Sequence, residues 1–365
     1  MVFNPSFIIT PDLTKALMEI EGIKEVIRYL PITPTIIKTL RESARLKSTH
    51  YSTYIEGNKL AEDEVKEVIK NNKSFKGRER DEKEIKGYFV ALEYVEKNAN
   101  KPITEEIIKT IHALVEGGGR NNIKPTTYRD GQNVIRDSSN GRIVYMPPEY
   151  KDVPLLMKEL VEYLNNNINK IPIPILASIA HYQFATIHPY YDGNGRTARL
   201  LTNLVLYRSG YDLKGIYSLE EYYANNLQEY YKAISIGEHH NYYFGRAEAD
   251  ITPWIEYFVF GMLSAFKNVK KHAESQIGEK DEDKTKILRS LTPQQRKVLT
   301  LFEDTDIITS NDIANLFNFT QRSARNLATK LVSEGFLEIK DKANRTRSFR
   351  LNSMLIKNCD RLYDR

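Results

Sequence analysis

The sequence predicts a mainly α-helical protein with one β-hairpin near its middle and a small unit of helices and strands at its C-terminal end. Three observations lead to this prediction. Apolar residues recur at helical spacing through most of residues 35–274. Two extended runs, 132–135 and 142–146, flank a turn-forming Ser-Ser-Asn-Gly segment. A charged stretch that is poor in apolar residues, 275–289, then precedes a segment with both helical and alternating patterns.

Residues 1–35 indicate an arm with one short helix, and further helices are expected at 35–54, 61–72, 81–98 and 104–115. Thr104 is a good cap for the last of these, with Glu105 and Glu106 in its first turn. After the hairpin, helical periodicity resumes at 152–167, 175–187 and 195–209, and continues less regularly through 219–235 and 250–274. These patterns divide the chain into a helical region at 1–100, a central core at 101–274, a linker at 275–289 and a domain at 290–365.

The C-terminal domain has the element order of a winged helix-turn-helix. Helices are expected at 293–303, 310–317 and 321–334, and strands at 336–340 and 348–351, with Thr292 and Thr320 as helix caps and Gly335 as a helix terminator. Residues 320–350 contain eight basic and three acidic side chains, which suits contacts with DNA phosphates. The basic residues are Arg322, Arg325, Lys330, Lys340, Lys342, Arg345, Arg347 and Arg350. Winged helices also serve as protein-docking or dimerisation modules, so this alternative stays open.

The composition excludes several classes of protein. The 365 residues include 53 Lys and Arg against 48 Asp and Glu, and the formal charge of +5 is too small for a nucleic-acid coat or a polybasic membrane binder. The single cysteine, Cys359, cannot form an intrachain disulfide or a Cys-rich zinc site, which fits a reducing compartment. The N-terminus lacks a secretory pattern, and no apolar stretch approaches the roughly 18 residues of a transmembrane helix. We therefore expect a soluble, cytoplasmic protein that does not bind membranes.

The segment from His188 to Arg199, HPYYDGNGRTAR, carries the strongest chemical signal. It joins two apolar helices, and a glycine-rich turn at a helix N-terminus directs backbone N–H groups at one point, which favours anions. Arg196 and Arg199 share a face of the second helix and can bind successive phosphates. Asp192 offers an oxygen ligand for Mg²⁺, and His188 can accept a proton from an attacking hydroxyl. These are the parts of a nucleotidyl- or phosphoryl-transfer site, whereas an ordinary interhelical turn is the alternative.

This segment closely resembles the signature of the Fic family, HPFxDGNGRxxR, with Tyr190 in place of Phe. The resemblance extends over roughly residues 35–260 and implies a helical Fic core that transfers AMP from ATP to protein hydroxyls. It implies that His188 is the general base and that Asp192 holds Mg²⁺. It further implies a nucleotide-binding set in which Arg196 and Arg199 take the β- and γ-phosphates, namely Gly193, Asn194, Gly195, Arg196, Thr197, Ala198 and Arg199. Glycine at 195 favours AMP transfer over the phosphorylating branch of the superfamily, which has Lys there.

Two further segments resemble parts of that family. The hairpin at 132–146 is similar to the flap that pairs with an extended segment of the target, and Val144, Tyr145 and Met146 would be its docking residues. A surface hairpin without such a role is the alternative. Tyr230 and Tyr231 match a tyrosine pair that lines the adenine pocket, although adjacent helix positions face different directions and at least one could be core packing.

Residues Ser52 to Gly57, STYIEG, resemble the inhibitory pattern [Ser/Thr]xxxEG of the family. Glu56 lies at the end of a predicted helix, where the helix dipole disfavours an anion by roughly 0.3–1 kcal/mol unless a cation offsets it. The resemblance implies that Arg199 is this cation and that Glu56 occupies the place of the γ-phosphate. A solvated glutamate at a helix end is the alternative.

The predicted function is therefore Mg²⁺-dependent transfer of AMP from ATP to a Tyr, Thr or Ser hydroxyl of a target protein, which could be the chain itself, under inhibition by Glu56. One alternative is a DNA-binding transcriptional regulator whose core senses nucleotide. Another is removal of AMP, with Glu56 positioning water. Related proteins commonly form dimers, so a homodimer is a further expectation from the resemblance.

Overall fold

The computed structural model describes residues 3–30, 34–120, 122–136, 141–236, 240–278, 291–302, 305–341 and 347–352. Contacts divide the chain into two units, Met1–Arg28 with Arg41–Lys270 and Tyr29–Leu40 with Lys271–Arg365. Each unit is described by itself.

The N-terminal part of the chain is helical. It comprises α1 (Pro11–Tyr29), α2 (Pro34–Ile55), α3 (Glu62–Asn71), α4 (Glu79–Asn98) and α5 (Glu105–Glu116). The helix expected within residues 1–35 is present, but it is 19 residues long and not short. Thr104 caps α5 as expected, because its side chain accepts a hydrogen bond from the N–H of Ile107. Gly57 follows α2 with a φ of 93°, a conformation that glycine adopts without strain, so the chain can leave the helix there.

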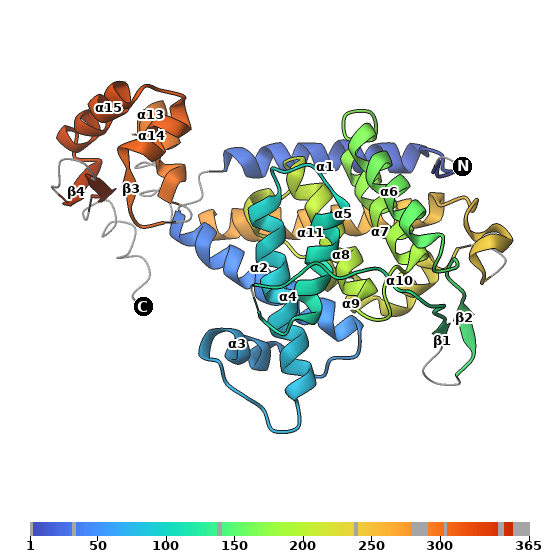
Figure 1. The fold of residues 1–365 in the computed structure, drawn as a ribbon. Helices are drawn as coiled ribbons and strands as arrows, with labels where there is room; N and C mark the ends of the chain where they lie inside the picture. The colour runs from blue at the N-terminus through green and yellow to red at the C-terminus, as the bar shows by residue number, and fades with distance from the viewer. Residues whose placement is uncertain are drawn as a thin grey trace. The chain divides into compact units, whose positions relative to one another are not determined.

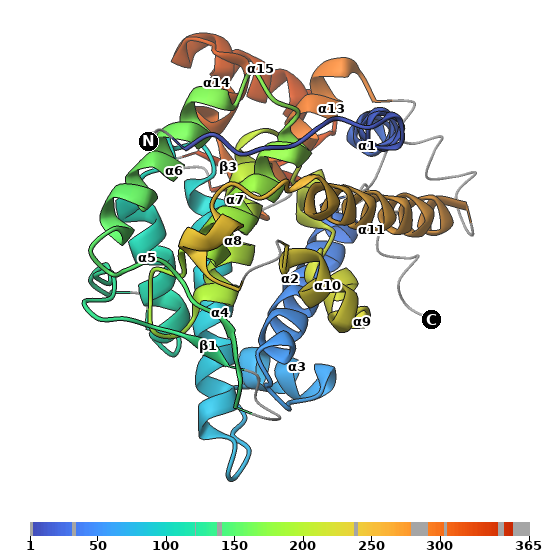
Figure 2. The ribbon, with the colours of Figure 1, turned by 90° about the vertical axis from the view of Figure 1, so that its right-hand side faces the viewer.

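The centre of the first unit is the pair α7 (Ile173–Ile187) and α8 (Asn194–Arg208), which pack on each other and on α4, α5 and α6 (Val153–Asn167). Figures 1 and 2 show α8 enclosed among these helices. The apolar residues that the sequence places on the two central helices are all buried. They are Leu176, Ile179, Ala180, Phe184, Ile187, Leu200, Leu201, Leu204 and Val205. Each such side chain stabilises the fold by roughly 1.5–3 kcal/mol, so the segment between α7 and α8 joins two rigid elements.

The predicted hairpin is present, with shorter strands than expected. Strands β1 (Ile135–Arg136) and β2 (Ile143–Tyr145) are antiparallel, and Figure 1 shows them extending from the helices. Residues 132–134 are not a strand, because their side chains bond to nearby backbone groups instead of leaving the backbone to a ladder: Gln132 donates to Pro147 O at 3.0 Å and Asn133 accepts from Val134 N at 2.8 Å. The expected turn at 138–140 lies outside the described residues.

The remaining elements of this unit are α9 (Glu220–Asn225), α10 (Leu227–Ile234), the short segments η1 (Leu213–Gly215) and η2 (Tyr242–Arg246), and α11 (Thr252–Gly278). The single helix expected at 219–235 is divided at Asn226, whose φ of −132° is not helical. Helix α11 continues to Gly278, beyond the predicted end at 274, so residues 275–278 are helical. The rest of the predicted linker, 279–289, lies outside the described residues.

The C-terminal unit contains α13 (Pro293–Leu299), η3 (Thr300–Phe302), α14 (Ser310–Phe317) and α15 (Gln321–Ser333), with an antiparallel sheet in the order β3-β5-β4. The strands are β3 (Ile308–Thr309), β4 (Leu337–Asp341) and β5 (Ser348–Leu351). Thr292 and Thr320 cap α13 and α15 as predicted, and Gly335 follows α15 with a φ of 72°. Strand β3 was not predicted, because two residues are too few for an alternating pattern.

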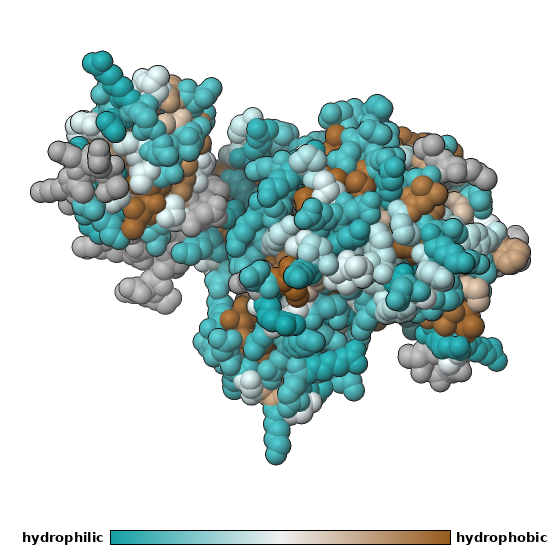
Figure 3. All heavy atoms as spheres, viewed as in Figure 1, coloured by the Kyte–Doolittle hydropathy of each residue, from teal (hydrophilic) through white to brown (hydrophobic). Residues whose placement is uncertain are grey.

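No helix in the described part of the chain is long and apolar enough to span a membrane. The face drawn in Figure 3 is largely hydrophilic, with small separate hydrophobic patches.

Candidate active site

The segment between α7 and α8 is a tight turn held by its own polar groups. His188 ends α7 with a φ of 51°, and Gly193 precedes α8 with a φ of 73°. The side chain of Asn194 closes the turn, because its Oδ1 accepts from Tyr190 N at 3.0 Å and its Nδ2 donates to Tyr190 O at 2.8 Å. Asn194 belongs to the nucleotide-binding set expected from the resemblance, and that role stays a prediction. Both its polar atoms are used inside the turn.

The first turn of α8 has three backbone N–H groups that make no hydrogen bond within the helix. The N–H groups of Asn194, Gly195 and Arg196 have no intrahelical acceptor, as at any helix start, whereas Thr197 N already donates to Gly193 O. A Cβ at Gly195 would lie 2.1 Å from Glu56 Oε1 and 3.3 Å from Arg199 Nη1, so the absent side chain leaves room for these two groups. Thr197 and Ala198 are fully buried, and Thr197 Oγ1 has no hydrogen-bond partner among the described residues. Their nucleotide contacts stay a prediction.

Arg199 is buried, with 1% of its side chain exposed, and it binds the end of α2. Its Nε donates to Ser52 Oγ at 2.7 Å, and its Nη2 donates to Ser52 O and to Glu56 Oε1, both at 2.8 Å. Its Nη1 has no partner among the described residues. The side-chain contact predicted for Glu56 and Arg199 is therefore present, and the guanidinium nitrogen Nη1, buried beside Gly195, lacks a hydrogen-bond partner among the described residues.

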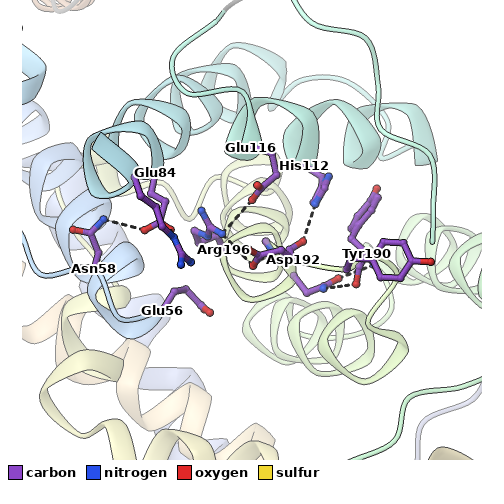
Figure 4. Close-up of polar contacts among 12 residues, drawn as sticks. Glu56, Asn58, Glu84, His112, Glu116, Tyr190, Asp192 and Arg196 are labelled. Carbon is purple, nitrogen blue, oxygen red and sulfur yellow. Dashed lines mark hydrogen bonds and ion pairs between the residues drawn. The ribbon is translucent and has the colours of Figure 1, made fainter. Parts of the chain in front are cut away.

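Arg196 lies between two carboxylates, as Figure 4 shows. Its Nη2 is 3.1 Å from Glu116 Oε1 and 3.4 Å from Asp192 Oδ1. Sequence analysis did not identify Glu116, because a glutamate at the end of α5 has no local pattern that distinguishes it from a solvated one. Burial raises the pKa of Glu116, which Arg196 partly opposes. The Asp192 side chain is 68% exposed, so its carboxylate can take a further ligand.

His112 on α5 holds the turn from outside and was also not identified from the sequence. Its ring stacks on Tyr190 with centroids 3.6 Å apart, and its Nε2 is 2.9 Å from Asp192 O (Figure 4). Burial lowers the pKa of His112 to about 4, so the ring is neutral at neutral pH. A neutral ring donating to the carbonyl of Asp192 fixes the turn without adding charge next to Arg196.

His188 is partly buried at the entrance to the same turn. Burial lowers the pKa of His188 to about 4, with Arg129 acting in the same direction and Glu56 and Asp192 against it. Its Nδ1 is 3.4 Å from Ala185 O. A donor at Nδ1 leaves the lone pair of Nε2 to accept a proton, which is the form that a general base requires.

The two tyrosines of the expected adenine pocket differ in their surroundings. Tyr230 is buried, and its OH lies 3.0 Å from Nε2 of His181. Tyr231 is 47% exposed, and its OH donates to Ile55 O at the end of α2, at 3.1 Å. Tyr230 therefore packs in the core, and Tyr231 is the member of the pair that can meet a ligand.

The three predicted docking residues of the hairpin differ in exposure and in contacts. The Val144 side chain is 39% exposed, whereas Tyr145 is buried and its OH donates to Thr186 O at 2.7 Å. The backbone of Met146 pairs with the segment 240–242, through Met146 N to His240 O at 2.8 Å and Tyr242 N to Met146 O at 3.0 Å. Tyr145 and Met146 anchor the hairpin, and of the three residues Val144 faces outward.

Comparisons with known proteins agree with this geometry. Residues 102–206 match the family model described as the Fic/DOC family. The chain is 29% identical over 219 residues to protein adenylyltransferase fic-1 of Caenorhabditis elegans, covering 58% of this chain and 41% of that protein. It is 31% identical over 184 residues to protein adenylyltransferase Fic of Aedes aegypti, covering 49% of this chain and 35% of that protein. The chain thus spans less than half the length of these curated relatives.

Solved structures share the fold. A Fic family protein from Desulfovibrio desulfuricans matches with a TM-score of 0.61 at 23% identity, over 96% of this chain and 98% of that one. The structure of fic-1 from Caenorhabditis elegans matches with a TM-score of 0.55 at 22% identity, over 71% of each chain. The helical core around α7 and α8 is therefore a fold already known in Fic proteins.

Proposed function

We propose that the chain, whose residues 102–206 match the model of the Fic/DOC family, transfers AMP from ATP to a Tyr, Thr or Ser hydroxyl of a target protein. One observation carries this proposal more than the others. The buried guanidinium of Arg199 has an Nη1 beside Gly195 that lacks a partner among the described residues. Gly195 lies in the first turn of α8, where backbone N–H groups have no intrahelical acceptor, and a short turn joins this helix to His188. A triphosphate is the ligand that such a set of donors suits, because it carries several negative oxygens in a row.

Each residue of the turn has a distinct part in the proposed reaction. The N–H groups at Asn194, Gly195 and Arg196 would bind phosphate oxygens, and the guanidinium of Arg196 would bind the leaving pyrophosphate. The target hydroxyl oxygen forms a bond to the α-phosphorus, and the bond from this phosphorus to the pyrophosphate oxygen breaks. Nε2 of His188 takes the hydroxyl proton, so that AMP-protein and pyrophosphate are the products.

The residues present fit a magnesium ion as the family implies. Asp192 supplies a largely exposed carboxylate next to the proposed phosphate site, and oxygen ligands are those that Mg²⁺ prefers. When bound, Mg²⁺ would neutralise negative charge on the phosphates. Because Asp192 Oδ1 also accepts from Gly193 N at 2.6 Å, the same carboxylate is already oriented by the turn.

Glu56 would inhibit this reaction within the chain. Its carboxylate accepts a hydrogen bond from Arg199 Nη2 and lies next to Gly195, in the place where a Cβ would be. A phosphate would compete with it for the same guanidinium. Ser52 contributes two more acceptors to Arg199, so α2 holds the guanidinium at three points. Release of α2 from Arg199 would therefore precede productive binding of ATP.

The C-terminal unit carries a second proposed function, binding of a DNA duplex as a winged helix. The supporting observation is the exposed face of α15, on which Gln321, Arg322, Arg325 and Asn326 are all exposed. Of the predicted wing, Lys342 and Arg345 lie outside the described residues. Charge reversal of Arg322 and Arg325 in the full chain should abolish a salt-dependent shift of a random duplex. An unchanged shift would contradict this function.

Intact-mass spectrometry tests the transferase proposal. The purified chain is incubated with magnesium and ATP, as the parent protein and as Glu56→Gly. We expect a gain of one adenylyl group that is greater in Glu56→Gly and absent when His188→Ala is added. A gain of one phosphoryl group would indicate kinase chemistry, and no gain in Glu56→Gly with any added protein would contradict the proposal.

A further inference from the structure

Arg129 is a buried cation in the segment between α5 and β1. The residue is 4% exposed, and all three nitrogens of its guanidinium donate to backbone carbonyls. Nε donates to His188 O at 3.0 Å, Nη1 donates to Gly131 O at 3.0 Å, and Nη2 donates to Pro148 O. Its own backbone N–H donates to Pro189 O at 2.9 Å. Arg129 thus bonds to both residues at the start of the turn that precedes α8.

The three carbonyls belong to three different segments. Gly131 precedes β1, Pro148 follows β2, and His188 is the proposed general base. A single planar group therefore joins the two ends of the hairpin to the residue that would accept the target's proton. Two other side chains of the hairpin region bond to neighbours of His188, since Asn133 donates to Tyr190 O at 3.2 Å and Tyr145 donates to Thr186 O at 2.7 Å.

The partners of Arg129 are unusual for a buried charge. Its guanidinium makes no ion pair with a carboxylate in the part of the chain that the structure describes. Burial lowers the pKa of Arg129, which shows that its surroundings do not favour the charge. Backbone dipoles alone offset the loss of hydration incompletely. A guanidinium can nevertheless reach three acceptors in different directions within one plane, and the ammonium of lysine cannot.

We infer that Arg129 is a positioning residue for the transfer reaction, which fixes the hairpin β1–β2 relative to His188. This inference rests on the proposed function and on the hairpin as the place where the target docks. A target segment aligned on the hairpin would then bring its hydroxyl to a set distance from Nε2 of His188. Among the described residues, Arg129 makes no hydrogen bond to the phosphate-binding groups of α8, so we expect its loss to affect the placement of the target more than ATP binding.

The test uses the full chain with Glu56→Gly, so that transfer can be measured. Arg129→Lys keeps the positive charge and loses the planar group that donates to the carbonyls of His188, Gly131 and Pro148. We expect kcat for self-modification with labelled ATP to fall by about tenfold or more, since an ångström of misplacement can cost about 100-fold. The KM for ATP should stay within about twofold, because the α8 groups are untouched. Arg208→Lys is the matched control, since Arg208 also donates to a backbone carbonyl, that of Lys101, at the opposite end of α8.

Hydrogen exchange followed by mass spectrometry gives a second measurement that needs no activity. In Arg129→Lys, the amides of residues 131–136 and 143–148 should exchange faster while those of α8 keep their rates. Transfer at the parental rate, or unchanged exchange in the hairpin, would overturn the inference. Absence of transfer in the Glu56→Gly parent would instead count against the proposed function, and the exchange result would still decide whether Arg129 fixes the hairpin.

Discussion

Glu56 and Arg199 lie 143 residues apart in the sequence, and their side chains form an ion pair of 2.8 Å in the structure. The arginine is almost completely buried, whereas the glutamate keeps about a third of its side chain exposed. A buried cation that loses its carboxylate becomes costly. The pair therefore stabilises the fold. In the proposed mechanism, it also engages the guanidinium of Arg199, which should bind ATP.

The first prediction concerns this pair. Glu56→Gly should lower the melting temperature, because Arg199 loses its carboxylate, and should make stabilisation by ATP larger than in the parent protein. Self-modification should rise by about tenfold, the factor that corresponds to about 1.4 kcal/mol. Thermal unfolding with and without magnesium and ATP measures the first effect. Equal stabilisation of both proteins by ATP would show that Glu56 and ATP do not compete.

The second prediction concerns Tyr231, whose hydroxyl bonds to the last residue of α2. Tyr231→Phe removes a hydrogen bond worth about 0.5–1.5 kcal/mol and should loosen the inhibitory end of the helix. Basal self-modification should rise by roughly two- to tenfold, less than in Glu56→Gly. Tyr163→Phe on α6, whose ring packs on Phe3, is a control with the same chemical change. Equal rates in Tyr231→Phe and the parent would show that this bond does not hold α2.

The third prediction concerns pH. The pKa of His188 is lowered to about 4 by burial, so the ring is neutral and able to accept a proton at every pH well above this value. The transfer rate should be independent of His188 ionisation near neutral pH and should fall as the pH drops through about 4. Single-turnover rates checked by circular dichroism at each pH separate protonation from unfolding. An acid limb near pH 6.5 would show that His188 is not desolvated during catalysis.

The fourth prediction concerns Asp192. Asp192→Asn keeps an acceptor for Gly193 N but removes the charge that would hold magnesium, so the magnesium concentration for half-maximal transfer should rise by about tenfold or more. Paramagnetic resonance of bound Mn²⁺ in the presence of ATP measures the same loss without catalysis. Parental Mn²⁺ affinity in the variant would place the metal elsewhere.

The sequence was sufficient for the helices because their apolar faces repeat over many residues, and α2, α7, α8 and α15 are present close to the predicted ranges. The turn at 188–195 was recognisable because its residues are contiguous. Residues that contact this turn from other elements could not be recognised in the same way. Examples are Arg129, His112 and Glu116. Each is an ordinary polar residue in its own segment and acquires a role through contacts more than 40 residues distant, which no local pattern records.

The same limit applies to the direction in which a side chain points. Asn194 and Tyr145 stand in segments whose resemblance to a family suggested ligand contacts, and the structure shows their polar atoms bonded to backbone carbonyls and amides of the protein itself. The sequence does not record whether these two side chains point toward a ligand or into the protein. In β2, Ile143 and Val144 are both exposed and Tyr145 is buried, so the burial of Tyr145 does not follow from strand alternation.

The most direct measurement follows phosphorus from ATP labelled at the α- or the γ-position onto protein, using Glu56→Gly and Glu56→Gly with His188→Ala. We expect α-label on the Glu56→Gly protein, no γ-label, and a loss of about 10²–10⁴-fold when the imidazole is removed. Transfer of γ-label, or α-label that persists without His188, would contradict the assignment of this turn as an AMP-transfer site.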